Sequence, residues 1–152
     1  GCHLGSEGCR SVLASPHLQR LAELNLSGND LGTGVLDPNA FRLPCLRSLE
    51  LAENDLNAAD VAQLTSSPTL NLSRLDLTGN AVGNSGLQSL ARWQAASGLH
   101  VLRLANSGIG DDGVRTLLQS SQFDGLEVLD LRDNQITLKS ELARRFATRV
   151  QC

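Results

Sequence analysis

The chain of 152 residues has few aromatic side chains and no methionine. Aromatic residues make up 3% of the sequence, with three phenylalanines, one tryptophan and no tyrosine. An interior with so few rings must be filled by Leu, Val, Ile and Ala, which suits a stack of thin, similar layers. The absence of methionine, at position 1 as elsewhere, indicates a processed product or an excised fragment.

Long apolar runs and clustered cations are also missing. No apolar run of about 18 residues occurs, so we expect no membrane-spanning segment, and no signal peptide is visible. The formal net charge of −3 argues against nucleic acid as the partner, because backbone binding needs many clustered cations. The sequence also lacks a phosphate-binding loop of the form G-x-x-x-x-G-K.

One eleven-residue frame, L-x-x-L-x-L-x-x-N-x-L, occurs five times. The copies begin at residues 21, 46, 72, 99 and 126, so their spacing is 25 to 27 residues. A clear copy is LEVLDLRDNQI at Leu126–Ile136. Chance does not repeat so long a frame at so regular a period, and a period of this length indicates a repeat array.

Each frame predicts a short strand followed by a structural turn. The L-x-L core alternates with outward residues at period two, which is typical of a strand. The asparagine that follows can satisfy backbone groups that cannot stay unpaired in a buried turn. These ladder positions are Asn29, Asn54, Asn80, Ser107 and Asn134. Because serine is shorter and has one donor, the turn at Ser107 is predicted to be the weakest.

The segments between the frames carry apolar residues at helical spacing. The pattern predicts a helix over about residues 58–65, and two more through the sets that begin at Leu87 and Val114. The Gly-x-x-Gly pairs at Gly83/Gly86 and Gly110/Gly113 are interpreted as turn punctuation. The candidate N-caps of these two helices are Asn84 or Ser85 and Asp111 or Asp112.

The two ends depart from the regular pattern. Residues 4–15 align with the back halves of later repeats, so we expect their strand to lie before the chain begins. Pro38 allows at most a short helical turn behind the first full frame. At the other end, one apolar stripe predicts a C-terminal helix with its cations facing water and no strand after it. The stripe consists of Leu138, Leu142 and Phe146, with Val150 as a further candidate member.

A strand followed by a helix at this period resembles the ribonuclease-inhibitor-like subclass of leucine-rich repeat proteins. The Leu and Asn frames and the G-x-x-G-x-x-x-L segments carry the resemblance over about Leu4–Val150. It implies an α/β fold, a right-handed solenoid (horseshoe) with a parallel inner sheet of about five strands and helices or turns on the convex face. The single domain, 1–152, would comprise a partial repeat 4–20, repeats 21–45, 46–71, 72–98 and 99–125, and a last repeat with its capping helix, 126–152.

In such a fold the outward strand residues stack into columns on the concave face. The middle column is Asn25, Glu50, Asp76, Arg103 and Asp130. Two interpretations stay open: a solvated polar face on which Arg103 neutralises its neighbours, or a contact patch for a basic or mixed-charge protein surface. The hypothetical centre of a protein-binding face is Glu50, Asp76, Arg103 and Asp130, with Glu23, Asn25, Arg74 and Arg132 around it.

The residues that could carry chemistry favour bland interpretations. Cys9 aligns with core positions of later helices, where a buried thiol acts as a small hydrophobe. Cys2, His3 and Cys9 lack the spacing of a zinc site, so no metal site is expected, and free thiols fit a reduced compartment. Trp93 is either a core filler or an exposed anchor. No nucleophile accompanies the histidines, so no catalytic residue is assigned.

Three functions are compared. The first is a non-enzymatic scaffold, monomeric, cytoplasmic and without cofactors, that binds another protein through its concave face and strand-exit loops. Some similar arrays are GTPase activators that act through exit-loop residues. Here those loops are acidic, with Arg132 the nearest cation, which is poorly suited to stabilising phosphoryl charge. The third is a segment of a larger sensor whose activity resides in another domain.

Overall fold

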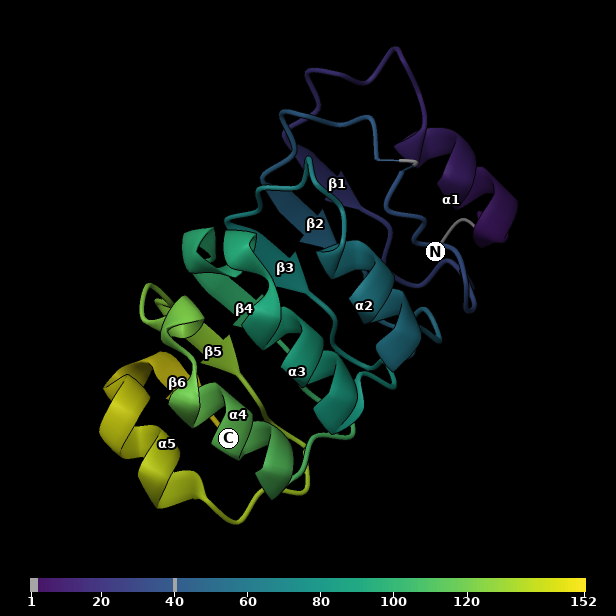
Figure 1. Cartoon of the computed structure of the whole chain (residues 1–152). Coiled ribbons are helices and arrows are strands. Elements are labelled where there is room, and N and C mark those ends of the chain that lie inside the picture. The colour runs from purple at the N-terminus through teal and green to yellow at the C-terminus, as the bar shows by residue number, and fades with distance from the viewer. Residues whose placement is uncertain (1–2, 40) are drawn as a thin grey trace.

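Short strands alternate with helices along the chain (Figure 1). The computed structural model describes residues 3–39 and 41–152, so the expectations that involve Cys2 lie outside the described residues. The strands are β1 (Glu23–Asn25), β2 (Ser48–Glu50), β3 (Arg74–Asp76), β4 (Val101–Arg103), β5 (Val128–Asp130) and β6 (Val150–Gln151). The α-helices are α1 (Gly5–Leu13), α2 (Ala58–Thr65), α3 (Gly83–Arg92), α4 (Asp111–Gln119) and α5 (Lys139–Phe146). Short 3₁₀ helices are η1 (Gln94–Gly98), η2 (Ser121–Phe123) and η3 (Ala147–Arg149).

The strands form one open parallel sheet in the order β1-β2-β3-β4-β5-β6. Each of the first five starts at the same place in its frame, and the register pairs equivalent residues, such as Leu49 with Leu75. These five predicted strands are confirmed. The expectation that no strand follows the last helix is wrong, because Val150 pairs with Leu129 and adds a sixth strand. Val150 therefore belongs to β6 and not to the helical stripe.

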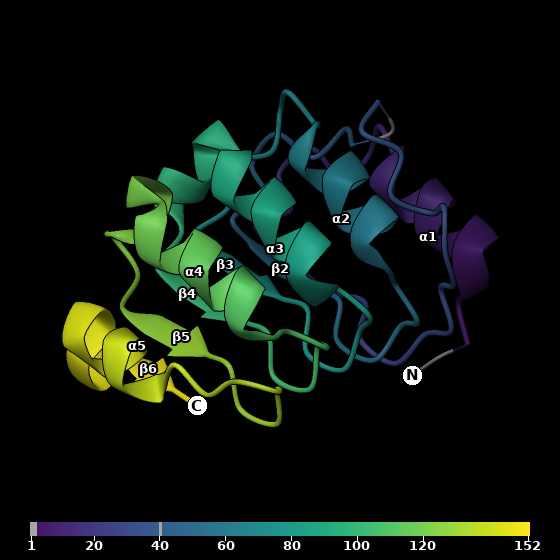
Figure 2. The same ribbon diagram turned by 60° about the horizontal axis from the view of Figure 1, so that its bottom comes forward.

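All the helices lie on one side of the sheet and leave the other side uncovered (Figures 1 and 2). Leucines of the L-x-L cores point into the layer between sheet and helices and are buried, apart from half-buried Leu24 on the edge strand β1. The interior is mostly Leu, Val and Ile, with Phe123 and Phe146 filling the layers near the C-terminal end. The fold is the α/β solenoid that the repeats imply.

The connection from β1 to β2 is irregular. Its described residues contain turns, one of them at Pro38 and Asn39, and no helix, which agrees with the expected limit of at most a short helical turn near Pro38. Buried apolar side chains, among them Val35, Leu36 and Phe41, fill the place of a helix. Helix α1 packs against this segment, where Arg42 N–H donates to the Leu13 carbonyl at 2.9 Å.

The helix N-termini are capped differently from the expectation. Only α2 has a side-chain capping box, in which Asn57 and Asp60 each accept a backbone N–H of the other. Helices α3 and α4 have no side-chain N-cap. Instead, Asn84 Oδ1 accepts from the next repeat, from Gly110 N–H at 2.8 Å and Gly113 N–H at 3.1 Å. The polar residue satisfies its neighbour's first turn, so it ties two layers together.

The second glycine of each Gly-x-x-Gly pair lies inside a helix. A Cβ on Gly86 would lie 2.6 Å from Val82 Cγ1, and one on Gly113 would lie 2.7 Å from Asn84 Oδ1. Turn punctuation is therefore the wrong interpretation for these two residues. They permit a close approach of side chains that any other residue would obstruct. Gly83, with φ 60°, does supply a turn conformation.

The C-terminal helix α5 is confirmed, but two of its neighbouring cations do not simply face water. Arg145 donates to the carbonyls of Leu118 and Ser120 and pairs with Asp124 at 2.6 Å. Arg149, just beyond the helix, donates to the Asp124 and Leu126 carbonyls. Both guanidinium groups also lie over the Phe146 ring, at 5.3 and 5.9 Å from its centroid. They satisfy backbone groups of the preceding repeat and so close the last layer.

Candidate protein-binding face

The two outward columns of the concave face are present. The register places Glu23, Ser48, Arg74, Val101 and Val128 side by side, and likewise the middle column Asn25, Glu50, Asp76, Arg103 and Asp130. Every candidate residue of the face belongs to one of these columns except Arg132, which follows β5. The sheet therefore brings the candidate side chains together on one surface.

Several side chains of the middle column, however, accept hydrogen bonds from backbone N–H groups. Leu77 N–H donates to the Arg103 carbonyl of the next strand, and the N–H of the following residue, Thr78, donates to Asp76 Oδ1 at 3.0 Å. Asn25 and Asp130 accept from the equivalent N–H groups two residues on, at 2.9 and 3.2 Å. Short Asn and Asp side chains suit this local bond. Their presence in the column therefore has a structural cause.

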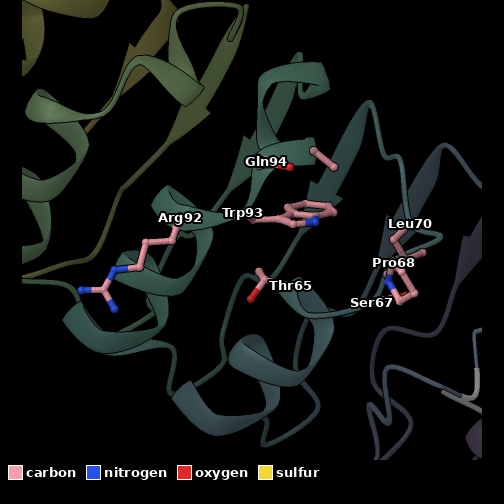
Figure 3. A pocket seen from close by; sticks show the side chains of 8 residues that line it. Thr65, Ser67, Pro68, Leu70, Arg92, Trp93 and Gln94 are labelled. Atoms are coloured by element: carbon pink, nitrogen blue, oxygen red, sulfur yellow. The ribbon is translucent and has the colours of Figure 1, made fainter.

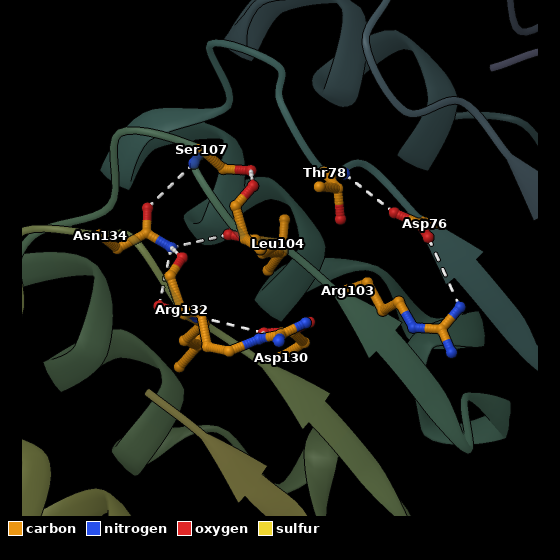
Figure 4. A network of polar contacts seen from close by, with 10 residues as sticks. Asp76, Thr78, Arg103, Leu104, Ser107, Asp130, Arg132 and Asn134 are labelled. Carbon is orange, nitrogen blue, oxygen red and sulfur yellow. Dashed lines mark hydrogen bonds and ion pairs between the residues drawn. The ribbon is translucent and has the colours of Figure 1, made fainter. Parts of the chain in front are cut away.

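Two ion pairs neutralise the same carboxylates (Figure 4). Arg132 binds Asp130 through two nitrogens, at 2.9 and 2.7 Å, and this carboxylate is 5% exposed while its partner is 61% exposed. The bond from Arg132 is the main reason that the pKa of Asp130 is lowered, and it raises the pKa of Arg132. Arg103 lies 3.5 Å from Asp76. The solvated-face interpretation has Arg103 neutralise both neighbours, whereas among the described residues Arg103 forms an ion pair with Asp76 and none with Asp130.

Three charged residues of the face are not engaged in ion pairs with the described residues. Among the described residues, Glu23, Glu50 and Arg74 have no ion-pair partner within 4.0 Å. Glu50 accepts one hydrogen bond, from Asn25 Nδ2 at 2.5 Å. The two glutamates line a hollow of about 320 Å³ together with Leu24, Asn25 and Ser48. The hollow has no cation among its lining residues.

The ladder asparagines form several hydrogen bonds each; Asn29, Asn54 and Asn80 are buried and Asn134 is half-buried. Asn54 Nδ2 donates to the Leu26, Leu51 and Ala52 carbonyls at 2.8 to 3.1 Å. Its Oδ1 accepts the N–H of Asn29 in the preceding repeat at 2.9 Å. Asn80 and Asn134 make the same kinds of bond. Each asparagine joins its own turn to the neighbouring layer, so their predicted structural role is confirmed.

Ser107 makes a reduced version of these contacts (Figure 4). Its hydroxyl lies 3.3 Å from the Leu77 carbonyl and 3.1 Å from that of Ala105, whereas the side-chain amide of Asn54 donates hydrogen bonds to three carbonyls. Val82 N–H donates to the Asn80 carbonyl within its own turn. The equivalent N–H of Leu56 reaches the ladder side chain of the next repeat, Asn80 Oδ1, at 3.0 Å. Serine thus leaves the junction between the third and fourth repeats with fewer bonds.

The exit loops owe part of their acidic character to backbone geometry. The residue before each ladder position has φ between 48° and 69°, in the order Gly28, Glu53, Gly79, Asn106 and Asp133. Gly, Asn and Asp are the residues that tolerate this region best. This recurring position, which is Gly, Asn or Asp in every repeat except at Glu53, was not interpreted from the sequence, although its signal was present there. Asp111, also near the exit, accepts from the Thr137 hydroxyl and N–H, and these bonds lower its pKa.

The remaining candidate residues are mostly structural. Cys9 is buried, as predicted, and burial raises its pKa to about 11. Trp93 is 5% exposed, which favours the core interpretation over the exposed anchor. Its edge borders a hollow of about 380 Å³ at the C-terminal ends of α2 and α3, where Figure 3 shows it facing Thr65 and Pro68. His100 is exposed at the entry to β4, as expected.

Residues 3–39 and 41–152 contain neither a candidate metal-binding cluster nor a candidate membrane-spanning helix. No group of three or more His, Cys, Asp or Glu side chains could hold a metal ion. No helix in those ranges has both the length and the apolar character needed to cross a membrane.

Comparison with known protein families supports the interpretation of the five frames as structural repeats. The family described as leucine-rich repeat matches residues 70–91, 99–118 and 126–139, which cover strands and helices of the last three full frames. These three segments are similar to leucine-rich repeats. The human leucine-rich repeat-containing protein 14 is 38% identical over 99 residues, and the mouse protein is 37% identical over the same length. The match covers 60% of this chain but only 20% of either relative.

A solved structure confirms the architecture. An internalin from Listeria monocytogenes superposes with a TM-score of 0.59 and 24% sequence identity. The superposition covers 88% of this chain and 34% of the internalin. At this level of identity the likeness establishes the solenoid fold alone.

Proposed function

We propose that this chain is a leucine-rich repeat protein that binds another protein through its concave face and strand-exit loops, and has no catalysis of its own. The observation that carries the proposal is the uncovered side of the sheet, on which Glu23, Glu50 and Arg74 have no ion-pair partner among the described residues. Exposed charges add little stability to a fold. A protein partner gives such side chains a use.

The size and shape of the face support a macromolecular partner. Parallel strands lie about 4.8 Å apart, so six of them span a ribbon of roughly 24 Å. A standard specific interface covers about 800 Å² on each partner, so the proposed interface includes the exit loops beside the short strands. The hollow at β1 and β2 is open and shallow, which suits a side chain of a partner better than an enclosed substrate.

The exit loops offer weak support for GTPase activation. Stabilising a transferring phosphoryl group requires a cation that is free to reach it. Arg132, the nearest cation, is held by Asp130 through two nitrogens. We therefore prefer binding without catalysis, and an assay of GTP hydrolysis with candidate GTPases would expose an error in that choice.

The finer assignments belong to the same proposal. The helices α2, α3 and α4 at the convex side support the ribonuclease-inhibitor-like subclass, whereas the helix-free first repeat departs from it. We propose one domain with the repeat boundaries given above, acting as a monomer in the cytoplasm, with neither nucleic acid nor membrane as its partner. Free thiols at Cys9 and Cys45 are compatible with a reducing compartment.

Site-specific photocrosslinking tests the proposed face. A photoreactive residue at Ser48, on the concave face, is compared with one at Gln88, which is exposed on helix α3. Each variant is irradiated in extract from the native source, and the adducts are identified by mass spectrometry. We expect a specific adduct from Ser48 and none from Gln88. An adduct from Gln88 alone would overturn the proposal, because the partner would then bind the helices.

A further inference from the structure

The concave face has three chemically different parts in a fixed order. At β1 and β2 lies the hollow with Glu23 and Glu50, which has no cation in its lining. At β3 follows Arg74, a half-buried cation with no ion pair among the described residues. At β4 and β5 the same column presents the half-buried side chains of Val101 and Val128. The face therefore runs acidic, basic, apolar from β1 to β5.

The distances between these parts match an extended chain. With about 4.8 Å between strands, the centre of the hollow lies roughly 7 Å from Arg74. The midpoint between Val101 and Val128 lies roughly 7 Å further on. In an extended segment, side chains on one face repeat every second residue, at about 6.7 Å. Alternate residues of such a segment, laid across the strands, would meet the three parts in turn.

We infer that the concave face binds an extended segment of a partner protein whose alternate side chains run basic, acidic, apolar from β1 to β5. This inference rests on the proposed function and names the chemistry of its partner. A Lys or Arg enters the acidic hollow and pairs with Glu23 and Glu50. An Asp or Glu two residues away pairs with Arg74. An apolar side chain two residues further covers Val101 and Val128. The middle-column pairs Asp76–Arg103 and Asp130–Arg132 neutralise the rest of the surface.

Peptide display tests this order. The whole chain, residues 1–152, is immobilised and used to select from a library of random twelve-residue peptides. We expect enrichment of sequences in which a basic, an acidic and an apolar residue occur at every second position, in either chain direction. Enrichment of the same three residues at a spacing of four would instead indicate a helix. That outcome, or the absence of any enrichment, overturns the inference.

Variants of the chain connect each peptide position to its part of the face. In the double variant Glu23→Lys/Glu50→Lys, the enrichment of basic residues should fall about tenfold, as loss of a close charge pair implies. Arg74→Glu should replace the preferred acidic residue with a basic one. The control Glu141→Lys makes one such Glu-to-Lys charge reversal on helix α5 and should leave the selection unchanged. Preferences that do not respond to the face variants overturn the inference.

The two proposals can fail separately. If the Ser48 crosslink captures a partner but the selected peptides lack the expected order, the concave face binds its partner by other chemistry. The proposed function then stands and the inference fails. If only the Gln88 position captures a partner, the proposed function itself is wrong. Thermal unfolding of each variant establishes that it is folded before its selection is interpreted.

Discussion

Two sets of polar residues lie a few positions apart in every repeat, and they behave differently. The ladder asparagines are buried, apart from half-buried Asn134, and each bonds to backbone groups in two neighbouring layers. On the concave face, Asp76 and Asp130 cap local N–H groups and pair with arginines. Among the described residues, Glu23, Glu50 and Arg74 on the same face neither cap a local N–H group nor form an ion pair. Residue type alone does not separate these three roles.

The difference shows what a polar residue in a repeat must be tested for. A side chain that satisfies a buried backbone group is required by the fold, whatever it displays to solvent. Only those side chains whose groups remain unpaired or water-facing are free to recognise a partner. By this criterion the candidate face contracts from eight residues to its β1–β3 end and the two valines beside it.

The largest loss of stability is expected from Asn54→Ala. It removes an amide that is 0% exposed, whose NH2 group donates to three carbonyls and whose oxygen accepts one N–H, and it leaves buried carbonyls without partners. We expect the free energy of unfolding in urea to fall by about 2–4 kcal/mol. The matched control is Asn71→Ala, because Asn71 is exposed and should change stability by less than about 0.5 kcal/mol. Equal losses in the two variants would contradict the ladder's role.

A smaller loss is expected from Asp130→Asn. The amide cannot accept the charge-assisted pair from Arg132, so the free energy of unfolding should fall by about 1–2 kcal/mol. Asp55→Asn, at an exposed loop position, serves as the control. Denaturation of the two variants alongside the unmodified chain measures both effects. A loss for Asp55→Asn as large as that for Asp130→Asn would mean that the ion pair contributes nothing.

The same carboxylate should make stability depend on pH. Because the pKa of Asp130 is lower in the folded chain, its contribution is present above the ordinary aspartate pKa, about 3.9. It is lost as the pH falls from there through the lowered folded value. The stability difference between the unmodified chain and Asp130→Asn should therefore shrink between pH 5 and pH 2. A difference that stays constant over that range would contradict the assignment.

A gain of stability is expected from Ser107→Asn. This change completes the ladder and restores an amide that can reach the Leu77, Leu104 and Ala105 carbonyls and accept from the third repeat. We expect the free energy of unfolding to rise by about 1 kcal/mol, the net value of a typical hydrogen bond. The increase should be accompanied by slower amide exchange at Asn80 and Val82. Lower stability would show that the fourth turn is shaped for serine.

The smallest effect on stability is expected from a substitution of Glu50, a face residue without an ion-pair partner among the described residues. Glu50→Gln should change the free energy of unfolding by less than about 0.5 kcal/mol, because the side chain lies at the surface and keeps an acceptor for Asn25. The same change should weaken selection of basic peptides. Comparing the two measurements separates a residue used for recognition from one used for folding. A stability loss near that of Asn54→Ala would place Glu50 with the ladder.

Much of the fold follows from the sequence because one frame carries it. The repeated leucines and asparagines predict five strands, their order and the composition of the outward columns. Helix α2 occupies the predicted residues, 58–65. The residues 150–151 were missed as a strand, because a two-residue pairing in a shorter final unit repeats no frame. Arg145 and Arg149 were taken for surface cations, since sequence periodicity does not show which carbonyls a long side chain reaches.

The site was less predictable for a related reason. The columns could be written down in advance, but the bonds within them depend on side-chain length. Asp76 is short enough to take the N–H of Thr78, whereas Glu50 extends away and meets Asn25. Asn84 was expected to cap its own helix and caps the next one. Contacts between layers therefore separate structural from available side chains, and a single sequence read along the chain does not contain them.

The central claim is that recognition occurs on the uncovered strands. Nuclear magnetic resonance tests it most directly: the amide spectrum of the chain is recorded with and without the partner captured at Ser48. Shifts should concentrate in β1, β2 and β3 and at Val101 and Val128, with little change in α2, α3 and α4. Shifts confined to those helices would contradict the claim.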